Sequence, residues 1–253
     1  MAAMVPEALT DFFKTHPRLA LAFSGGTDSA YLLCAALGCG CDVTAYYIAS
    51  PFQPAFERSD AQRLAKELRA NLKILEMDTL AHAAIRANPP DRCYHCKRAI
   101  FTALTAAARA EGRELMDGTN ASDDAADRPG MKALRELKVR SPLRECGITK
   151  AMVREYSRQS GLFTWNKPAY ACLATRIPAG TALDRETLQK VEAAEAALSG
   201  LGFSDLRCRV FHGAARLQFP AAQLERAIRL RGDIREALKD AFEIILIDTE
   251  DRG

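Results

Sequence analysis

The residues with the clearest chemical meaning form a short run of small and polar side chains near the N-terminus, Ser24-Gly-Gly-Thr-Asp-Ser29. An apolar segment ends at Phe23 just before this run, and a helical pattern continues from Ala30 to Leu37 after it. Two glycines let the backbone approach a phosphate without a Cβ in the way, and free amides at a helix N-terminus attract anions. The run therefore predicts a phosphate-binding loop. It is not a Walker A loop, which requires a lysine.

The elements that must position this loop alternate between strand and helix patterns. After the first strand and helix, strand patterns occupy residues 42–48, 72–77 and 114–120, and helical patterns occupy residues 60–72 and 91–108. This order predicts an α/β fold with a doubly wound parallel sheet, in which ligands bind at the carboxyl ends of the strands. We therefore expect Ser24 to share one site with Asp117, Thr119 and Asn120. The polar run 123–130 predicts a loop over that site.

The character of the sequence changes after Pro178. A helix is predicted at 185–198, strands at 205–211 and 215–219, a helix at 221–241 and a strand at 242–247. We therefore expect a first domain over residues 1–177 and a small α+β domain over residues 178–253.

Composition narrows the class of protein. The 253 residues are 48% hydrophobic, which is ample for a core, and the formal net charge of +3 gives no basic footprint of a dedicated nucleic-acid binder. We expect no nucleic-acid partner and no membrane, because the sequence has no run of eighteen apolar residues. It shows no signal-peptide pattern, and so we expect a cytoplasmic protein, in which eight cysteines favour metal or thiol chemistry over disulfides.

Three of the cysteines stand in a chemically meaningful context. Cys93 and Cys96 share the first turn of a helix that Asp91 is expected to cap, where the helix dipole, Arg92 and Lys97 favour thiolates. Such a pair suits zinc, redox chemistry or an iron–sulfur cluster. The third is Cys172; it has no second pair, which argues against a closed four-cysteine zinc site. Packing is the predicted role of the other five, Cys34, Cys39, Cys41, Cys146 and Cys208.

An ordered set of motifs then points to a family. The motifs are Ser24-Gly-Gly-Thr-Asp-Ser29, Asp117-Gly-Thr-Asn120, Asp127-Arg-Pro-Gly130, Trp165-Asn-Lys167 and Cys172-Leu-Ala-Thr-Arg-Ile-Pro178. Over nearly the whole chain the sequence resembles the LarE sulfur transferases, whose first motif is the PP-loop of the N-type ATP pyrophosphatases. The resemblance implies that the protein adenylates a carboxylate of pyridinium biscarboxylic acid mononucleotide, releasing pyrophosphate, and inserts sulfur, in the synthesis of the nickel-pincer nucleotide.

The resemblance also assigns residues. It implies catalytic roles for Asp28, Cys172 and Arg176, with Mg²⁺ on the phosphates of ATP. The expected ATP-binding residues are Ser24, Gly25, Gly26, Thr27, Asp28, Ser29, Asp117 and Thr119. The expected contacts of the nucleotide substrate are Trp165, Thr175, Arg176, Glu195, Arg207 and Arg209. Charged residues on a helix or strand are more often solvated surface, which is the alternative for the last three. Gln218 replaces an acidic residue of some relatives, so a metal role there is doubtful.

Two sulfur sources follow from the resemblance. In one branch of the family a single cysteine, here Cys172, gives up its sulfur and becomes dehydroalanine. In the other, three cysteines hold a [4Fe-4S] cluster that carries an extra sulfide, and the presence of Cys93, Cys96 and Cys172 places this chain there. The family also implies a homo-oligomer, a hexamer in some relatives, and the helix around Leu224–Arg231 is the expected contact.

Three other functions remain in view. A tRNA thiolase also combines such a loop with Cys-x-x-Cys and a distant cysteine, but the weak net charge argues against it. An amidating enzyme related to NAD synthetase would leave the three cysteines without a role. A nucleotide-binding or zinc-stabilised module without activity is the third.

Overall fold

The structure is a computed structural model that describes residues 3–123 and 129–250, without the side chains of residues 129 and 130. It divides into two compact units. The first comprises Met1–Ser50, Ala55–Met77 and Asp91–Ala169, and the second comprises Pro51–Pro54, Asp78–Pro90 and Tyr170–Gly253. The second unit is therefore assembled from three stretches of sequence. The domain boundary between residues 177 and 178 stays a prediction.

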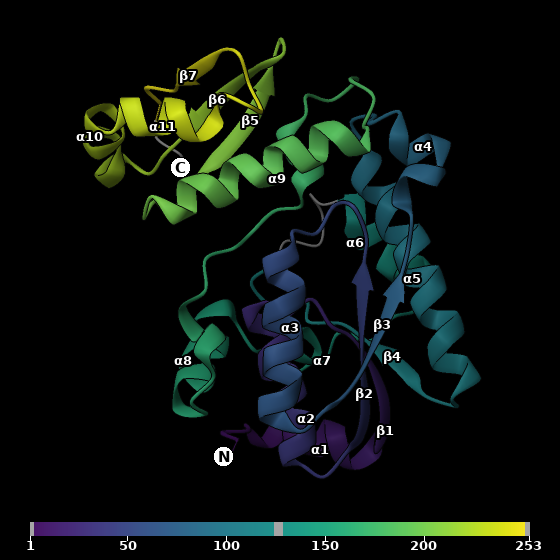
Figure 1. Cartoon of the computed structure of the whole chain (residues 1–253). Helices are drawn as coiled ribbons and strands as arrows, with labels where there is room; N and C mark the ends of the chain where they lie inside the picture. Colours follow the sequence, from purple (N-terminus) through teal and green to yellow (C-terminus); the bar gives the residue numbers. More distant parts are fainter. Residues whose placement is uncertain (1–2, 124–128, 251–253) are drawn as a thin grey trace. The chain divides into compact units, whose positions relative to one another are not determined.

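The first unit is built around a parallel sheet (Figure 1). Its strands are β1 (Arg18–Ala22), β2 (Asp42–Ala49), β3 (Asn71–Glu76) and β4 (Glu114–Met116), in the order β3-β2-β1-β4. Its helices are α1 (Glu7–Thr15), α2 (Thr27–Gly38), α3 (Ala55–Leu68), α5 (Arg92–Ala110), α6 (Pro129–Glu136), α7 (Pro142–Glu145), α8 (Lys150–Gln159) and the 3₁₀ helix η2 (Phe163–Asn166). The predicted α/β fold with a parallel sheet is confirmed.

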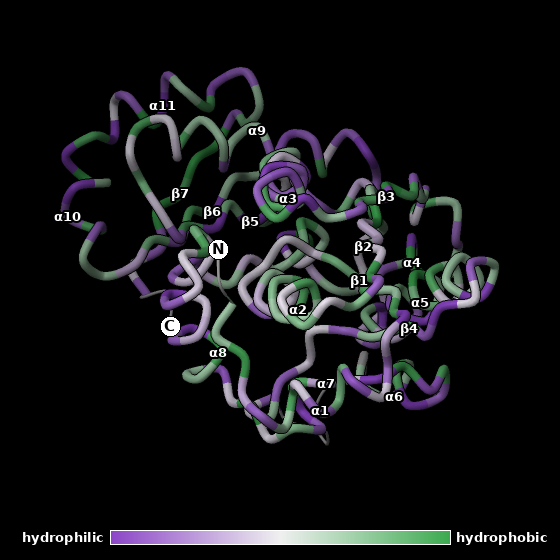
Figure 2. Tube along the Cα trace, turned by 90° about the horizontal axis from the view of Figure 1, so that it is seen from below, coloured by the Kyte–Doolittle hydropathy of each residue, from purple (hydrophilic) through white to green (hydrophobic). Residues whose placement is uncertain are grey.

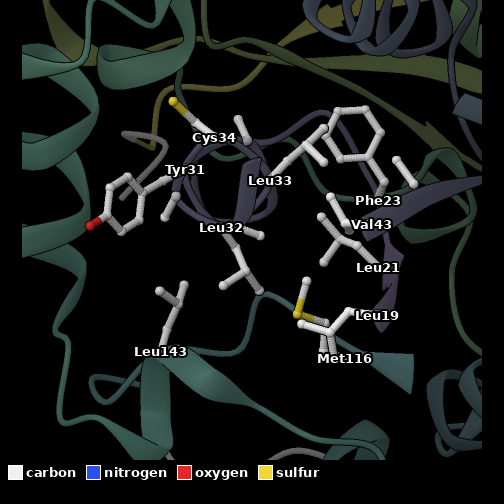
Figure 3. Packing of buried hydrophobic residues seen from close by; sticks show 14 of the residues in the cluster. Leu19, Leu21, Phe23, Tyr31, Leu32, Leu33, Cys34, Val43, Met116 and Leu143 are labelled. Carbon is white, nitrogen blue, oxygen red and sulfur yellow. The ribbon is translucent and has the colours of Figure 1, made fainter. Parts of the chain in front are cut away.

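Alternation along the strands gives the sheet two buried faces. In β1, Leu19 and Leu21 pack with α1, α2 and α3, whereas Ala20 packs with α5 and α6 on the opposite face. Figure 3 shows the first of these cores, where Leu19 of β1 lies beside Met116 of β4 and Leu32 and Leu33 of α2 face the strands. Figure 2 shows hydrophobic colours all round α2, whereas α3 carries many hydrophilic residues. Burial on both sides explains why β1 and β2 have almost continuously apolar sequences, whereas the edge strand β3 is partly exposed.

The second unit is a small α+β unit. Its sheet has the order β5-β6-β7, with β5 (Arg207–Phe211) antiparallel to β6 (Ala214–Gln218) and β7 (Ile245–Ile247) parallel to β6. Its helices are η1 (Thr79–Ala81), α4 (Ala83–Arg86), η3 (Leu173–Arg176), α9 (Arg185–Gly200), α10 (Ala221–Arg229) and α11 (Arg231–Leu238). Figure 1 shows α9 alongside this sheet.

Several predicted boundaries were wrong. The predicted helix 221–241 is two helices separated at Leu230, and Gly232, which has low helix propensity, lies just after the break. Strand β4 ends at Met116 rather than residue 120, and β7 is shorter than predicted. The predicted loop 123–130 lies mostly outside the described residues, but residues 129 and 130 begin α6.

Candidate active site

The predicted phosphate-binding loop joins β1 to α2. Strand order reverses here, since β1 lies between β2 and β4, and such a point is where ligands bind in open parallel sheets. Gly25 has φ of +71°, and a Cβ on it would lie 3.1 Å from the Cβ of Ala61 on α3, so only glycine fits. Helix α2 starts at Thr27, and its N-cap residue, Gly26, provides no side-chain cap. The amides of its first turn are therefore available to an anion.

The loop that follows β4 contacts this first loop. A Cβ on Gly118 would lie 3.0 Å from the backbone nitrogen of Ser29, so the two loops touch through their backbones. The buried Asp117 accepts hydrogen bonds from Thr119 Oγ1 at 2.5 Å and Ser141 Oγ at 2.7 Å. Burial raises the pKa of Asp117, and these two hydrogen bonds and the charge of Lys97 oppose the rise. The expectation that the ends of β1 and β4 lie together is confirmed.

Lys150 is a residue that the sequence did not single out. Its Nζ lies 2.5 Å from Oδ2 of Asp28, while Asn120 Nδ2 donates to the other carboxylate oxygen at 3.2 Å. Thr149 caps α8 by accepting from the amide of Met152, which makes Lys150 the first residue of that helix. A threonine before a helix predicts where the helix begins. It does not predict that the next residue lies beside Asp28.

The segment around Trp165 is tied to the start of α2. The hydroxyl of Thr27 donates to the carbonyl of Thr164 at 2.9 Å, in a buried position. Arg154 of α8 donates to the carbonyls of Trp165 at 3.1 Å and Lys167 at 3.3 Å. With its backbone held in this way, Trp165 remains 40% exposed. An exposed aromatic ring beside the start of α2 can stack on a flat ligand, and its substrate role stays a prediction.

The Cys-x-x-Cys pair lies on the first turn of α5, as predicted. Cys93 is exposed and Cys96 partly buried, and Arg92 Nη2 lies 3.7 Å from the sulfur of Cys93. The predicted cap was wrong in one respect, because Asp91 makes no capping bond and instead lies 3.2 Å from Nε2 of His95. A side-chain contact with His95 at the next turn replaces the cap.

The third cysteine belongs to the second unit. The carbonyl of Cys172 accepts two hydrogen bonds from Thr175, from the amide at 3.0 Å and the hydroxyl at 2.8 Å. The amide of Leu173 donates to the carbonyl of Phe52 at 2.9 Å. Within neither unit do the described residues gather three Cys, His, Asp or Glu side chains as metal ligands. Cys93 and Cys96 are in one unit and Cys172 in the other, and the shared cluster stays a prediction.

The second unit buries a charged cluster. Arg176 is 1% exposed, and its Nε donates to Oε1 of Glu195 on α9 at 2.7 Å. Glu195 is 8% exposed and Arg207 of β5 is also buried. The alternative reading of Glu195 and Arg207 as solvated surface was therefore wrong. The charge pattern of a helix or strand does not reveal such burial, because charged residues are seldom buried without a partner.

A cavity of about 230 Å³ lies next to this cluster. It is lined by Thr175, Arg176, Ile177, Pro178, Ala179, Arg209, Val210, Phe211 and Arg216. Arg209 donates to the carbonyl of Thr175 at 2.8 Å and to Gln218 at 2.6 Å. Gln218 in turn donates to Asp248, so it orients Arg209. Three arginines and no carboxylate line the cavity, which suits an anion such as a phosphate.

Similar proteins identify the family. No family model matches the chain. A protein of Lactiplantibacillus plantarum named pyridinium-3,5-bisthiocarboxylic acid mononucleotide synthase, the LarE enzyme, is 37% identical over 214 residues, covering 83% of this chain and 78% of the relative. The chain belongs to the LarE family. An uncharacterized Synechocystis protein is 35% identical over 88% of this chain and 84% of its own length. An uncharacterized Methanocaldococcus jannaschii protein is 28% identical over 96% of this chain and 93% of its own length.

The site residues of this LarE-family chain fall into two groups. The first unit holds the predicted ATP-binding residues, Trp165 and the Cys-x-x-Cys pair. The second holds Cys172, Thr175, Arg176, Glu195, Arg207 and Arg209. Within each group the structure shows direct contacts, and the assigned ligand roles stay predictions. No helix in residues 3–123 or 129–250 combines the length and apolar character needed to cross a bilayer.

Proposed function

We propose that this protein is an ATP-dependent sulfur transferase that thiolates a carboxylate of pyridinium-3,5-biscarboxylic acid mononucleotide in the synthesis of the nickel-pincer nucleotide. The similarity to the Lactiplantibacillus plantarum synthase over 83% of the chain is the observation that carries this proposal. The uncapped start of α2 and the glycine backbone of its loop support the ATP-binding part.

The first half of the reaction activates the carboxylate. A carboxylate oxygen is a poor leaving group, so it attacks the α-phosphorus of ATP, the bond between the α and β phosphates breaks, and pyrophosphate leaves. The loop amides and Lys150 stabilise the negative charge that develops on pyrophosphate. Asp28 is the carboxylate placed to hold Mg²⁺, because hard cations prefer oxygen ligands. Lys150, the ion-pair partner of Asp28, would then be available to the phosphates.

The second half replaces oxygen by sulfur. A sulfide attacks the activated carbon and AMP leaves with the original oxygen. Cys93, Cys96 and Cys172 form no disulfide and are exposed or partly buried, and thiolates are the ligands of iron–sulfur clusters. Cys93, Cys96 and Cys172 would hold a [4Fe-4S] cluster, and the chemistry that it would supply is a sulfide for the transfer. The sacrificial alternative takes the sulfur from Cys172 alone.

The cavity lined by arginines is the proposed site for the phosphate of the mononucleotide. Arg209 and Arg216 both line this small cavity, and Arg216 also forms an ion pair with Asp248. Each is held by hydrogen-bond partners behind it, since Gln218 binds Arg209 and Asp248 binds Arg216 at 2.6 Å. A pre-oriented guanidinium group binds phosphate with a smaller entropic cost than a mobile one.

The proteins this chain resembles also suggest a cytoplasmic homo-oligomer, a hexamer in some of them. Ile228 of α10 is 52% exposed, and α10 is the helix expected to make the subunit contact. Light scattering at micromolar concentration should give a mass above that of a monomer. A monomeric mass would refute self-association through α10.

The product of ATP cleavage tests the activation step. With the biscarboxylic acid mononucleotide present, the protein should form AMP and pyrophosphate, and Asp28→Ala should lose both. Asp60→Ala is a matched control, because it removes another half-buried carboxylate that pairs with a lysine, Lys167, at 2.7 Å. Formation of ADP, or an unchanged rate in Asp28→Ala, would contradict the proposal.

Anaerobic purification with iron and sulfide assays tests the sulfur source. Alanine at Cys93, Cys96 or Cys172 should lose iron and thiolation together, whereas alanine at the buried Cys34 should spare both. The sacrificial route predicts that only alanine at Cys172 abolishes thiolation. After one turnover, residue 172 is then lighter by about 34 Da, the mass of H₂S. Dehydroalanine at position 172 would refute the cluster.

A further inference from the structure

The carboxylate of Glu195 accepts four hydrogen bonds from its neighbours. Its Oε1 accepts from Arg176 Nε at 2.7 Å and from the amide of Cys208 at 2.9 Å. Its Oε2 accepts from the hydroxyl of Tyr170 at 2.5 Å and from Arg176 Nη2 at 3.3 Å. An ionised carboxylate offers about four acceptor positions, and all are used here. Glu195 therefore holds Arg176, Tyr170 and the backbone of Cys208 in place.

Tyr170 is the neighbour whose role is unassigned. Its hydroxyl binds Glu195. The guanidinium carbons of Arg176 and Arg207 lie 4.9 Å and 5.1 Å from the centre of its ring. Cation–π contacts of this kind gain strength where the cations are buried, and both arginines are. A single side chain thus joins β5, η3 and α9, and it lies two residues before Cys172.

The chain is anchored equally on the other side of Cys172. Leu173 is fully buried and its amide donates to Phe52, and Thr175 makes two bonds to the carbonyl of Cys172. Between Tyr170 and Leu173 only Ala171 and Cys172 remain. The sulfur of Cys172 therefore projects from a segment that is held at both ends.

We propose that Tyr170 is a positioning residue that fixes the segment of Cys172 through its bond to Glu195, so that the sulfur is held where transfer occurs. The role of the sulfur rests on the proposed function. The fixation of the segment does not, because it is a property of the second unit alone.

The rate at which Cys172 is alkylated reports how firmly its segment is held, and this measurement needs no enzyme turnover. The full chain, after removal of iron by a chelator, is treated with iodoacetamide, and modification at Cys172 is followed by mass spectrometry. In Tyr170→Phe, which keeps the ring, the rate should rise about tenfold, because a lost hydrogen bond to a charged group shifts a local opening equilibrium by about that factor. Tyr170→Leu also loses the cation–π contacts and should react faster still.

Tyr46→Phe is the matched control. The hydroxyl of Tyr46 also donates to a glutamate, Glu111, which likewise holds Arg113, but in the first unit. This variant should leave the rate at Cys172 unchanged. Equal rates in the wild type and Tyr170→Phe, with both folded by circular dichroism, would overturn the proposal, as would the same rise in Tyr46→Phe.

Steady-state kinetics separates this inference from the proposed function. In Tyr170→Phe, kcat should fall about tenfold while the KM for ATP stays unchanged, because the ATP loop is in the other unit. A raised KM for ATP with unchanged kcat would contradict a positioning role. If the wild type itself forms no thiolated product, the proposed function fails, and the alkylation rates still decide whether Tyr170 fixes the segment.

Discussion

Replacing Glu195 by Gln should destabilise the second unit selectively. The glutamine keeps the shape and one oxygen, which can still accept from Arg176 Nε and the Cys208 amide, but its NH₂ group then faces the donor Arg176 Nη2. A buried guanidinium loses its counter-charge. Removing one partner of a buried ion pair costs about 3–5 kcal/mol, and because the oxygen remains we expect the lower end, about 3 kcal/mol.

Hydrogen exchange read by mass spectrometry resolves this effect by unit. A loss of about 3 kcal/mol corresponds to exchange about 100-fold faster in α9 and β5, whereas peptides from β1 and β2 should be unaffected. Glu186→Gln on the same helix is the control, because its side chain is 78% exposed and its pair with Lys190 should contribute less than about 0.5 kcal/mol. Adding Arg176→Met to Glu195→Gln should recover part of the loss, since no charge is then left unpaired.

Exchange in α9 that rises less than about threefold would refute the reasoning, because it would mean that the pair carries little net stability.

Three other outcomes are expected. Lys150→Ala should lower the rate of pyrophosphate release by about 100-fold, the loss typical of removing one donor to a developing negative charge, whereas Lys150→Arg should retain part of it; an unchanged rate would exclude the residue. Gly25→Ala should weaken ATP binding measured by calorimetry, because φ of +71° and the contact with Ala61 both oppose a Cβ. The hydrogen bond from Lys73, followed by that from Tyr46, lowers the pKa of Glu111 from 4.5 to about 2, so its stabilising contribution is complete above about pH 4.5 and is lost as the pH falls toward 2. The difference in unfolding free energy between the wild type and Glu111→Gln should shrink over that range, and a constant difference would contradict the argument.

The sequence predicted those features that depend on residues close together in the chain. The loop of Ser24 and Gly25 could be predicted because glycines between a strand and a helix have few other uses, and Asp117 because a strand pattern precedes it. The ion pair of Asp28 and Lys150 could not, since it joins residues 122 positions apart.

The burial of charged side chains was the second feature that the sequence could not predict. Glu195 lies on a helix on which Glu186 and Lys190 are exposed, and nothing in its own sequence sets it apart. Its burial depends on Arg176 and Tyr170, which come from a segment with no regular periodicity. A partner for a buried charge must be known before the burial can be predicted.

The three-part composition of the second unit has a consequence for the order of synthesis. Asn88 donates to the carbonyl of Pro178 at 2.9 Å, and its own carbonyl accepts from the amide of Gly180 at 2.8 Å. As the nascent chain leaves the ribosome, residues 51–54 and 78–90 emerge long before the partners they need. Their contacts with residues 170–253 can form only after about the last third of the chain has been translated. For the same reason a fragment of residues 170–253 lacks two of its own pieces and should not fold alone.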